Sequence, residues 1–151
     1  MAIREPDPPN PDFAETAVRF LMEMPIAKHL GFSVTGIGPG LFKITQPFRE
    51  ELSFRGGVFQ AGPVGTLADM AAACAGMTML PRGWAASTVD YTIKLFAPAA
   101  GEKIVARGRV VRSGRTLSVT AADVYVVQDG KETLCATALT TIRNFEASSS
   151  L

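Results

Sequence analysis

Asp69 is the residue of this sequence whose surroundings most strongly suggest chemistry. It lies in the most apolar stretch of the chain, between the segments TLA and MAAACA. A carboxylate in such surroundings loses favourable hydration, so it needs either hydrogen-bond partners or a catalytic task. Two structural explanations compete with catalysis: Asp69 lies on a solvent-facing stripe of a helix, or it is a structural acid with satisfied hydrogen bonds. The residue alone leaves all three open.

A glycine-rich segment directly before this stretch could supply the rest of a catalytic site. Residues 56–62 (GGVFQAG) run into a predicted helix. The first turn of a helix presents free backbone N–H groups and the positive end of the helix dipole. Such groups stabilise the oxyanion that forms when a carbonyl carbon is attacked. Asp69 follows about two turns later, where a carboxylate acts as a general base on water or as the nucleophile itself.

The helix that carries Asp69 is expected to be long and buried. Residues 63–80 (PVGTLADMAAACAGMTML) are rich in helix formers, and Pro63 stands in the first turn, where its missing N–H costs little. Pro81 and Gly83 are expected to end it. Because this segment is apolar on nearly every face, it belongs in the interior of the protein.

Before this helix, the pattern changes from helical to alternating. Helical spacing predicts a helix over residues 13–24, with Asp12 as N-cap and Glu15 as its capping-box partner. A short helical turn over residues 25–30 is expected to end at Gly31. Alternation then predicts a β-hairpin over residues 32–48, and mixed signals predict a loop over residues 49–62.

After the long helix, the sequence is strand after strand. Alternation predicts four strands, over residues 87–98, 102–112, 115–127 and 131–145. The dipeptide Asp129-Gly130 is a strong signal for a type I′ hairpin turn. The order of elements predicts an α+β fold: a curved antiparallel sheet of five to six strands wrapped around the long helix, with a further helix near the N-terminus.

Length and composition fit one domain without a nucleic-acid or membrane partner. The chain has 151 residues, of which 47% are apolar and 19% charged, with a net charge of +1. We expect a flexible arm over residues 1–12, one domain over residues 13–146 and a tail over residues 147–151. The start is polar and proline-rich, and no apolar run reaches the roughly 18 residues of a membrane span, so we expect a cytoplasmic protein. Cys74 and Cys135 lie in apolar stretches and are expected to be buried free thiols, and no spacing suggests a metal site.

The segment QAGPVGTLADMAAACA (residues 60–75) resembles a motif of a known family. It is similar to the pattern HGG-x-x-x-x-L-x-D of the PaaI-like, or 4-hydroxybenzoyl-CoA-type, acyl-CoA thioesterases of the hotdog fold, with Asp69 at the acidic position. Further segments resemble the lead-in, the next strand and the closing three strands of that family: MPIAKHLGFSV, STVDYTIKLFAPA and residues 108–142. The resemblance spans residues 24–145 in the family's order. It implies hydrolysis of an acyl-CoA, or a related acyl thioester, to free acid and thiol.

The resemblance assigns roles to five catalytic candidates. It implies that Asp69 activates water or attacks the thioester, and that Ala61 offers an oxyanion-hole N–H, with Gly62 next to it. Thr88 matches a Ser or Thr that positions water and is supplied across a dimer, although Thr is also an ordinary strand residue. Gln60 stands at the histidine position, where it can donate a hydrogen bond but cannot shuttle a proton.

The substrate-binding candidates follow from the same resemblance. Phe54, next to Arg55, occupies a position where the family often has Asn or Gln, and it cannot donate a hydrogen bond. Either Gln60 polarises the carbonyl instead, or the activity is altered or weak. The acyl pocket is expected to be lined by Phe54, Val58, Phe59, Met70 and Met77. Coenzyme A, as part of the substrate and not as a cofactor, is expected to contact Arg115, Lys94, Arg82 and Arg112, each of which could also be only a solvated surface charge.

Three other functions remain to be weighed. Dehydratases and hydratases of this fold need a catalytic histidine, and the sequence offers only His29, in a short early segment. A non-catalytic acyl-CoA binder or sensor would explain Phe54 and Gln60 as lost catalytic groups, but this chain has no spare output domain. A purely structural oligomer gives Asp69 no reason to be where it is. We expect at least a homodimer and favour a homotetramer, because a row of strands leaves edges that a second copy covers.

Overall fold

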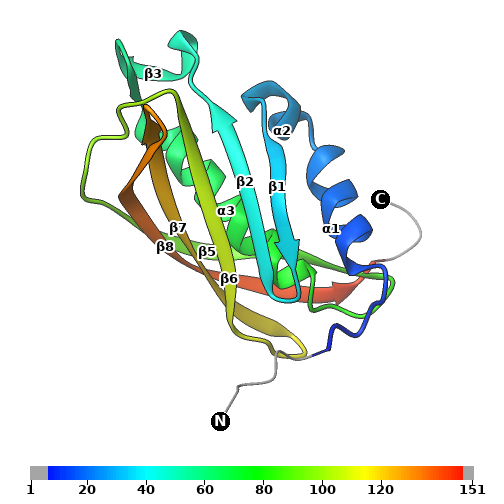
Figure 1. Ribbon diagram of the computed structural model, residues 1–151. Helices are drawn as coiled ribbons and strands as arrows, with labels where there is room; N and C mark the ends of the chain where they lie inside the picture. Colours follow the sequence, from blue (N-terminus) through cyan, green and yellow to red (C-terminus); the bar gives the residue numbers. More distant parts are fainter. Residues whose placement is uncertain (1–6, 148–151) are drawn as a thin grey trace.

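Six antiparallel strands form one curved sheet around the helix that carries Asp69 (Figure 1). The computed structural model describes residues 7–147. The strand order is β1-β2-β6-β7-β8-β5, so β1 and β5 are the edges. The strands are β1 (Ser33–Gly38), β2 (Leu41–Pro47), β5 (Trp84–Leu95), β6 (Lys103–Arg112), β7 (Leu117–Gln128) and β8 (Lys131–Glu146). The predicted α+β architecture, a hotdog fold, is confirmed.

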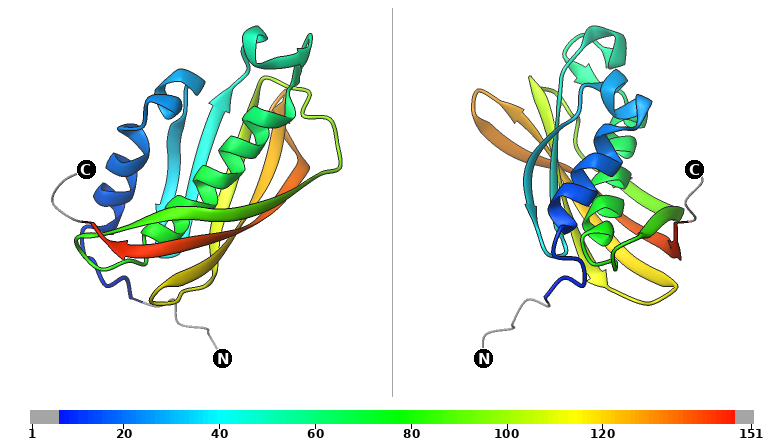
Figure 2. Two further views of the ribbon diagram at one scale, coloured as in Figure 1. Left: turned by 180° about the vertical axis from the view of Figure 1, so that it is seen from behind. Right: turned by 90° about the vertical axis from the view of Figure 1, so that its right-hand side faces the viewer.

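The central helix α3 (Ala61–Met77) lies in the concave face of the sheet, and β8 and β5 curl around it (Figure 2). It begins and ends earlier than the sequence predicted, because Gln60 caps its start and residues 78–80 close as a tight turn. Most of its residues are buried. Glycine on the sheet permits the close approach: a Cβ at Gly108 would lie 2.0 Å from the Ala71 carbonyl oxygen of α3. The all-round apolar character of the helix is thus explained by the sheet that wraps it.

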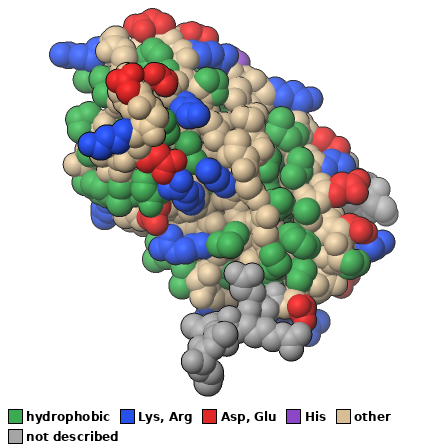
Figure 3. Space-filling model, viewed as in Figure 1, with side chains coloured by type: hydrophobic (Ala, Val, Ile, Leu, Met, Phe, Trp, Pro, Cys, Tyr) green, Lys and Arg blue, Asp and Glu red, His purple; other side chains and the backbone are tan. Residues whose placement is uncertain are grey.

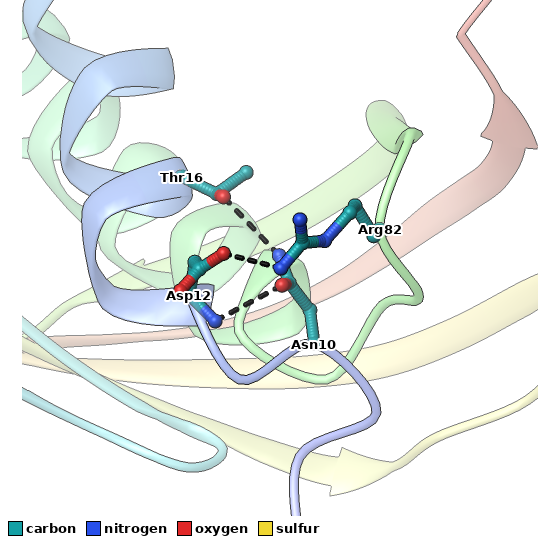
Figure 4. A network of polar contacts seen from close by, with 4 residues as sticks. All are labelled: Asn10, Asp12, Thr16 and Arg82. Atoms are coloured by element: carbon teal, nitrogen blue, oxygen red, sulfur yellow. Dashed lines mark hydrogen bonds and ion pairs between the residues drawn. The ribbon is translucent and has the colours of Figure 1, made fainter.

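Two further helices lead into the sheet, α1 (Phe13–Met22) and α2 (Pro25–Leu30), and α1 packs against α3. The predicted capping box is wrong, because the Asp12 side chain makes no cap hydrogen bond. Asp12 instead forms an ion pair with Arg82 in the turn between α3 and β5 (Figure 4). Asn10, which is 3% exposed, donates to Thr16 and accepts from the Asp12 N–H. The part of the predicted arm from Asn10 onward is therefore anchored to the domain, while residues 1–6 lie outside the described part.

The segment predicted as a loop contains short regular elements. A single turn of 3-10 helix (Glu50–Leu52) precedes a small hairpin of β3 (Ser53–Arg55) and β4 (Val58–Phe59). This hairpin is joined to the β5–β6 connection by the Phe59 N–H, which donates to the Ala99 carbonyl over 3.0 Å. The hairpin therefore covers the start of α3. At the β7–β8 turn, Asp129 and Gly130 both have positive φ, of 51° and 75°, which confirms the type I′ prediction.

The outer face of the sheet, turned toward the viewer in Figure 3, mixes charges of both signs with apolar side chains. Two ion pairs lie there, Arg107 with Glu132 at 2.7 Å and Arg109 with Asp123 at 3.0 Å. Both pairs are solvent-accessible and satisfied on this surface. The Asp69 carboxylate lies on the opposite, concave side of the sheet. No helix within residues 7–147 is long and apolar enough to cross a membrane.

Candidate active site

Asp69 is half-buried on α3, and its carboxylate has one hydrogen-bond donor from the neighbouring strand. Thr88 Oγ1 on β5 donates to Asp69 Oδ1 over 2.9 Å. Both residues belong to one chain. The resemblance implies that a second copy supplies this Thr; in the chain described here, β5 borders α3 and the contact is made within one protomer. Asp69 lies with Pro63, Thr66 and Met70 on the partly exposed stripe of α3, and the hydrogen bond from Thr88 is the one that residues 7–147 give its carboxylate.

Two opposing effects set the pKa of Asp69. Burial among apolar residues of α3 raises the pKa of this carboxyl, and the hydrogen bond from Thr88 partly offsets the rise. The net shift is upward. A carboxylate with a raised pKa is a stronger base toward water than an ordinary surface carboxylate. The nearby thiol of Cys74 is buried and free, and its pKa is also raised, mainly by burial and further by the charge of Asp69, so it is inert as a nucleophile.

A β-bulge on β5 brings a second polar side chain toward α3. The pairing of β5 with β8 shifts register between Thr88 and Asp90. As a result, Thr88 contacts Asp69, and the Tyr91 hydroxyl lies 3.5 Å from the position of a Cβ built on Gly65. Sequence reasoning missed Tyr91, because simple alternation from Thr88 would direct Asp90 toward the helix. The only indication in the sequence was that Tyr91 lies in a strand expected to pack beside the helix that carries Asp69.

At the start of α3, the Gln60 side chain caps the helix. Gln60 Oε1 accepts a hydrogen bond from the Gly62 N–H. One of the two backbone donors proposed for an oxyanion hole is therefore already occupied. The Ala61 N–H, by contrast, has no hydrogen-bond partner among residues 7–147. The amide nitrogen of Gln60 also remains available as a donor at this end of the helix.

A pocket of about 350 Å³ opens beside this helix start. It brings together several predicted residues with others that the sequence did not single out, and its lining is Phe54, Val58, Phe59, Gln60, Ala61, Val64, Leu95, Ala97, Pro98 and Ala99. The Phe54 ring is 67% exposed, and the Arg55 guanidinium lies 5.3 Å from its centroid. Met70 and Met77 do not line this pocket; Met77 is buried in the core and Met70 packs against it, and their assignment to the acyl pocket stays a prediction.

The basic candidates for coenzyme A do not converge within one chain. Arg112 and Arg115 line a second pocket, of about 330 Å³, at the β6–β7 turn. Arg115 also borders a cavity beside Leu80 and Pro81, which places this turn near the C-terminal end of α3, opposite to Gln60. Lys94 is exposed on β5 near the first pocket. Arg82 forms an ion pair with Asp12 (Figure 4), and its assignment to the nucleotide stays a prediction.

Neither a metal nor histidine chemistry is supported by the described side chains. Within residues 7–147, no cluster of three or more His, Cys, Asp or Glu side chains could hold a metal ion. His29 is exposed on α2, and among the described residues no hydrogen bond joins its side chain to Asp69. The arrangement offers a half-buried carboxylate, hydroxyl groups from β5 and a helix start beside an apolar pocket. Such a set of groups can activate water and stabilise an oxyanion.

Comparisons with known proteins concern the family and the fold of the chain. A family model described as "Thioesterase superfamily" matches residues 56–133, just over half of the 151 residues. No curated protein matches the chain. Among solved structures, a thioesterase family protein from Silicibacter pomeroyi is similar with a TM-score of 0.87 and 29% identity, over 89% of this chain and 99% of the other. The Escherichia coli PaaI protein from the phenylacetic acid degradation operon has a TM-score of 0.77 and 20% identity, over 91% of this chain and 96% of its own. A thioesterase from Haemophilus influenzae has a TM-score of 0.77 and 21% identity, over 90% of this chain and 92% of its own.

Proposed function

This chain belongs to the thioesterase superfamily, and we propose that it hydrolyses acyl-CoA thioesters with Asp69 as its essential carboxylate. The observation that carries the proposal is the setting of Asp69: a half-buried carboxyl with a raised pKa, bonded to Thr88, on the helix whose start borders an apolar pocket. The carboxylate is partly desolvated and has a single side-chain donor among the described residues. A catalytic base needs both features.

In the proposed reaction, deprotonated Asp69 takes a proton from water as the water oxygen attacks the thioester carbonyl carbon. The carbon–sulfur bond then breaks, and the protonated Asp69 returns its proton to the departing thiolate. A direct attack by Asp69 would instead form an anhydride that water opens. The two routes differ in the source of oxygen: single-turnover hydrolysis in ¹⁸O-water labels Asp69 only in the anhydride route.

The helix start supplies donors for the carbonyl oxygen in this proposal. Because Gly62 is already bonded to Gln60, the available donors are the Ala61 N–H and the Gln60 amide nitrogen. The adjoining pocket, with Phe54, Val58 and Phe59, is the proposed acyl site. Arg112 and Arg115 are the proposed contacts for the phosphates of coenzyme A, together with Lys94 and Arg55 nearer the acyl site. The acyl-CoA is substrate in this scheme, and no cofactor takes part.

A second copy is proposed to complete the site. Along one helix, Ala61 and Asp69 are eight residues apart, a rise of about 12 Å, which is long for one carbonyl group to bridge. The edge strand β5 exposes Val89 and Leu95, which are 59% and 46% exposed, and Phe96 directly after it is 56% exposed. In a two-fold antiparallel pair of β5 strands, the Leu95 end of each strand lies beside the Trp84 end of the other. Each helix start then approaches the other protomer's Asp69.

Val89→Asp tests this pairing. A charge on the paired edge is expected to yield a folded monomer by light scattering and to abolish turnover. A monomer with full turnover would show that one chain suffices. Whether dimers pair further into a tetramer is read from the same mass measurement on the unmodified protein.

Release of free thiol tests the function itself and separates it from the alternative. The protein is incubated with short, medium, long and aryl acyl-CoA thioesters, and thiol release is followed together with binding. We expect turnover with at least one class. Binding to an acyl-CoA without release of thiol would favour a non-catalytic binder. That result would be consistent with Phe54 at a position where the family often has Asn or Gln, and with Gln60 at the family's histidine position.

A further inference from the structure

Tyr91 presents a phenol hydroxyl to the same face of α3 that carries Asp69, one turn nearer the helix start. A Cβ built on Gly65 would lie 3.5 Å from the Tyr91 hydroxyl oxygen and 3.9 Å from its ring. Gly65 precedes Asp69 by four residues, so the two positions lie one above the other on the helix. The rise between them is about 6 Å, which leaves room for one small group between the carboxylate and the hydroxyl.

The bulge at Val89 is what aims this hydroxyl. Because Thr88 and Asp90 flank the register shift, the side chains of Thr88 and Tyr91 both face α3. In an unbroken strand, residues three apart point to opposite faces of the sheet. Bulges of this kind re-aim side chains and are frequent beside active sites.

The fold makes no use of the hydroxyl that it places there. No hydrogen bond joins the Tyr91 hydroxyl to any residue that the structure describes. Thr140, which pairs with Tyr91 across β8 and β5, has a buried Oγ1 that likewise lacks a partner among the described residues. A glycine at position 65 keeps the space before the Tyr91 hydroxyl open, although glycine weakens a helix interior. Tyr91 is 43% exposed, so its hydroxyl is open to solvent and to a ligand atom that enters the space beside Gly65.

We propose that the Tyr91 hydroxyl donates a hydrogen bond to the carbonyl oxygen of the thioester while Asp69 activates the attacking water. As the carbon–oxygen bond forms, negative charge develops on that carbonyl oxygen, and Tyr91 stabilises it without giving up its proton. When the carbon–sulfur bond breaks, the charge leaves with the sulfur, which receives the proton held by Asp69. This inference rests on the proposed thioesterase function. It adds a donor from the same protomer as Asp69 to the donors of the helix start, where the Gly62 N–H is already bonded to Gln60.

Tyr91→Phe removes only the hydroxyl, and Tyr125→Phe on the outer face of the sheet is its matched control, where the ring stacks with Arg107 at 4.4 Å. We expect Tyr91→Phe to lower kcat about 10²- to 10³-fold, as loss of one oxyanion donor does, with KM changed less than about threefold. The control is expected to keep both values. Turnover of Tyr91→Phe within about twofold of the unmodified protein would overturn the proposal.

Gly65→Ala provides a second test, in which Tm is expected to rise while turnover falls. The added methyl makes ordinary contact with the Tyr91 hydroxyl at 3.5 Å, so the variant should fold. Replacing a helical glycine with alanine should raise Tm by about 2–4 °C. We expect turnover to fall, because the methyl fills the space for the carbonyl oxygen. A stabilised variant with full turnover would overturn the proposal. If the unmodified protein releases no thiol from any acyl-CoA, the proposed function itself fails, which is a distinguishable result.

Discussion

Thr88→Val removes the one hydrogen bond that residues 7–147 give the Asp69 carboxylate, while keeping the β-branched shape of the side chain. The Thr88 hydroxyl donates to Asp69 Oδ1 over 2.9 Å and holds the pKa of the carboxyl lower than burial alone would set it. Without the donor, burial is the remaining cause, so the pKa of Asp69 rises further. Because the base must be deprotonated to work, the acid limb of the kcat/KM profile moves to higher pH.

The size of the loss follows from the partial exposure of Asp69. A hydrogen bond to a charged group contributes about 1.5–3 kcal/mol. Water replaces part of this at a half-buried carboxylate, which leaves about 0.7–1.4 kcal/mol, equal to about a 3- to 10-fold smaller deprotonated fraction of Asp69, and so of kcat/KM, at pH values below the acid limb. On the alkaline plateau the change is smaller, because Asp69 is deprotonated in both proteins. Initial rates of thiol release across the pH range measure both effects.

Two companion variants separate the hydrogen bond from other effects of substitution. Thr88→Ser keeps a hydroxyl and is expected to restore the position of the acid limb. Thr92→Val makes the same chemical change at an exposed position on the same strand and is expected to leave the profile unchanged. An acid limb of Thr88→Val that stays in place, or moves to lower pH, would refute the reasoning about Asp69.

Three further predictions concern the helix and its surroundings. Gly108→Ala should destabilise the protein by at least about 3 kcal/mol in chemical denaturation, because the new Cβ would lie 2.0 Å from the backbone oxygen of Ala71; retained stability would mean that α3 is free to shift. Gln60→Ala should lower kcat more than it raises KM, and equal changes would indicate a role in positioning only. Burial raises the pKa of Asp69 in the folded protein, so the folded state binds a proton more tightly than the unfolded chain, and stability falls as pH rises between the two pKa values. Asp69→Asn should therefore raise Tm at about pH 8, and this gain should narrow as the pH falls through the folded pKa; a constant gain would contradict the assigned charge state.

The fold could be predicted from the sequence because its strongest signals are local. Alternation marks the strands, the dipeptide Asp129-Gly130 demands positive φ, and a helix apolar on all faces requires a sheet that wraps it. Asp69 stood out for the same reason, since a carboxylate in an apolar helix conflicts with its surroundings. Each of these features is decided by residues close together in the chain.

What the sequence could not reveal depends on contacts between distant segments. The bulge at Val89 changes which side of β5 faces α3, and nothing in the alternation marks the extra residue. Asp12 has the right position for an N-cap but is drawn to Arg82, which is far away in the sequence. The contact of Thr88 with Asp69 within one protomer likewise depends on how closely β5 borders the helix. The bulge at Val89 is also the reason why the sequence did not indicate Tyr91.

The most direct test of the account compares Asp69→Asn with the unmodified protein on its best acyl-CoA substrate. The Asn side chain is nearly isosteric and can still accept the hydrogen bond from Thr88, so the variant should fold and keep its oligomeric mass, but it cannot take a proton from water. Loss of a general base predicts that kcat/KM falls about 10²- to 10⁴-fold. Thiol release by the folded variant within about threefold of the unmodified protein would contradict the central role given to Asp69.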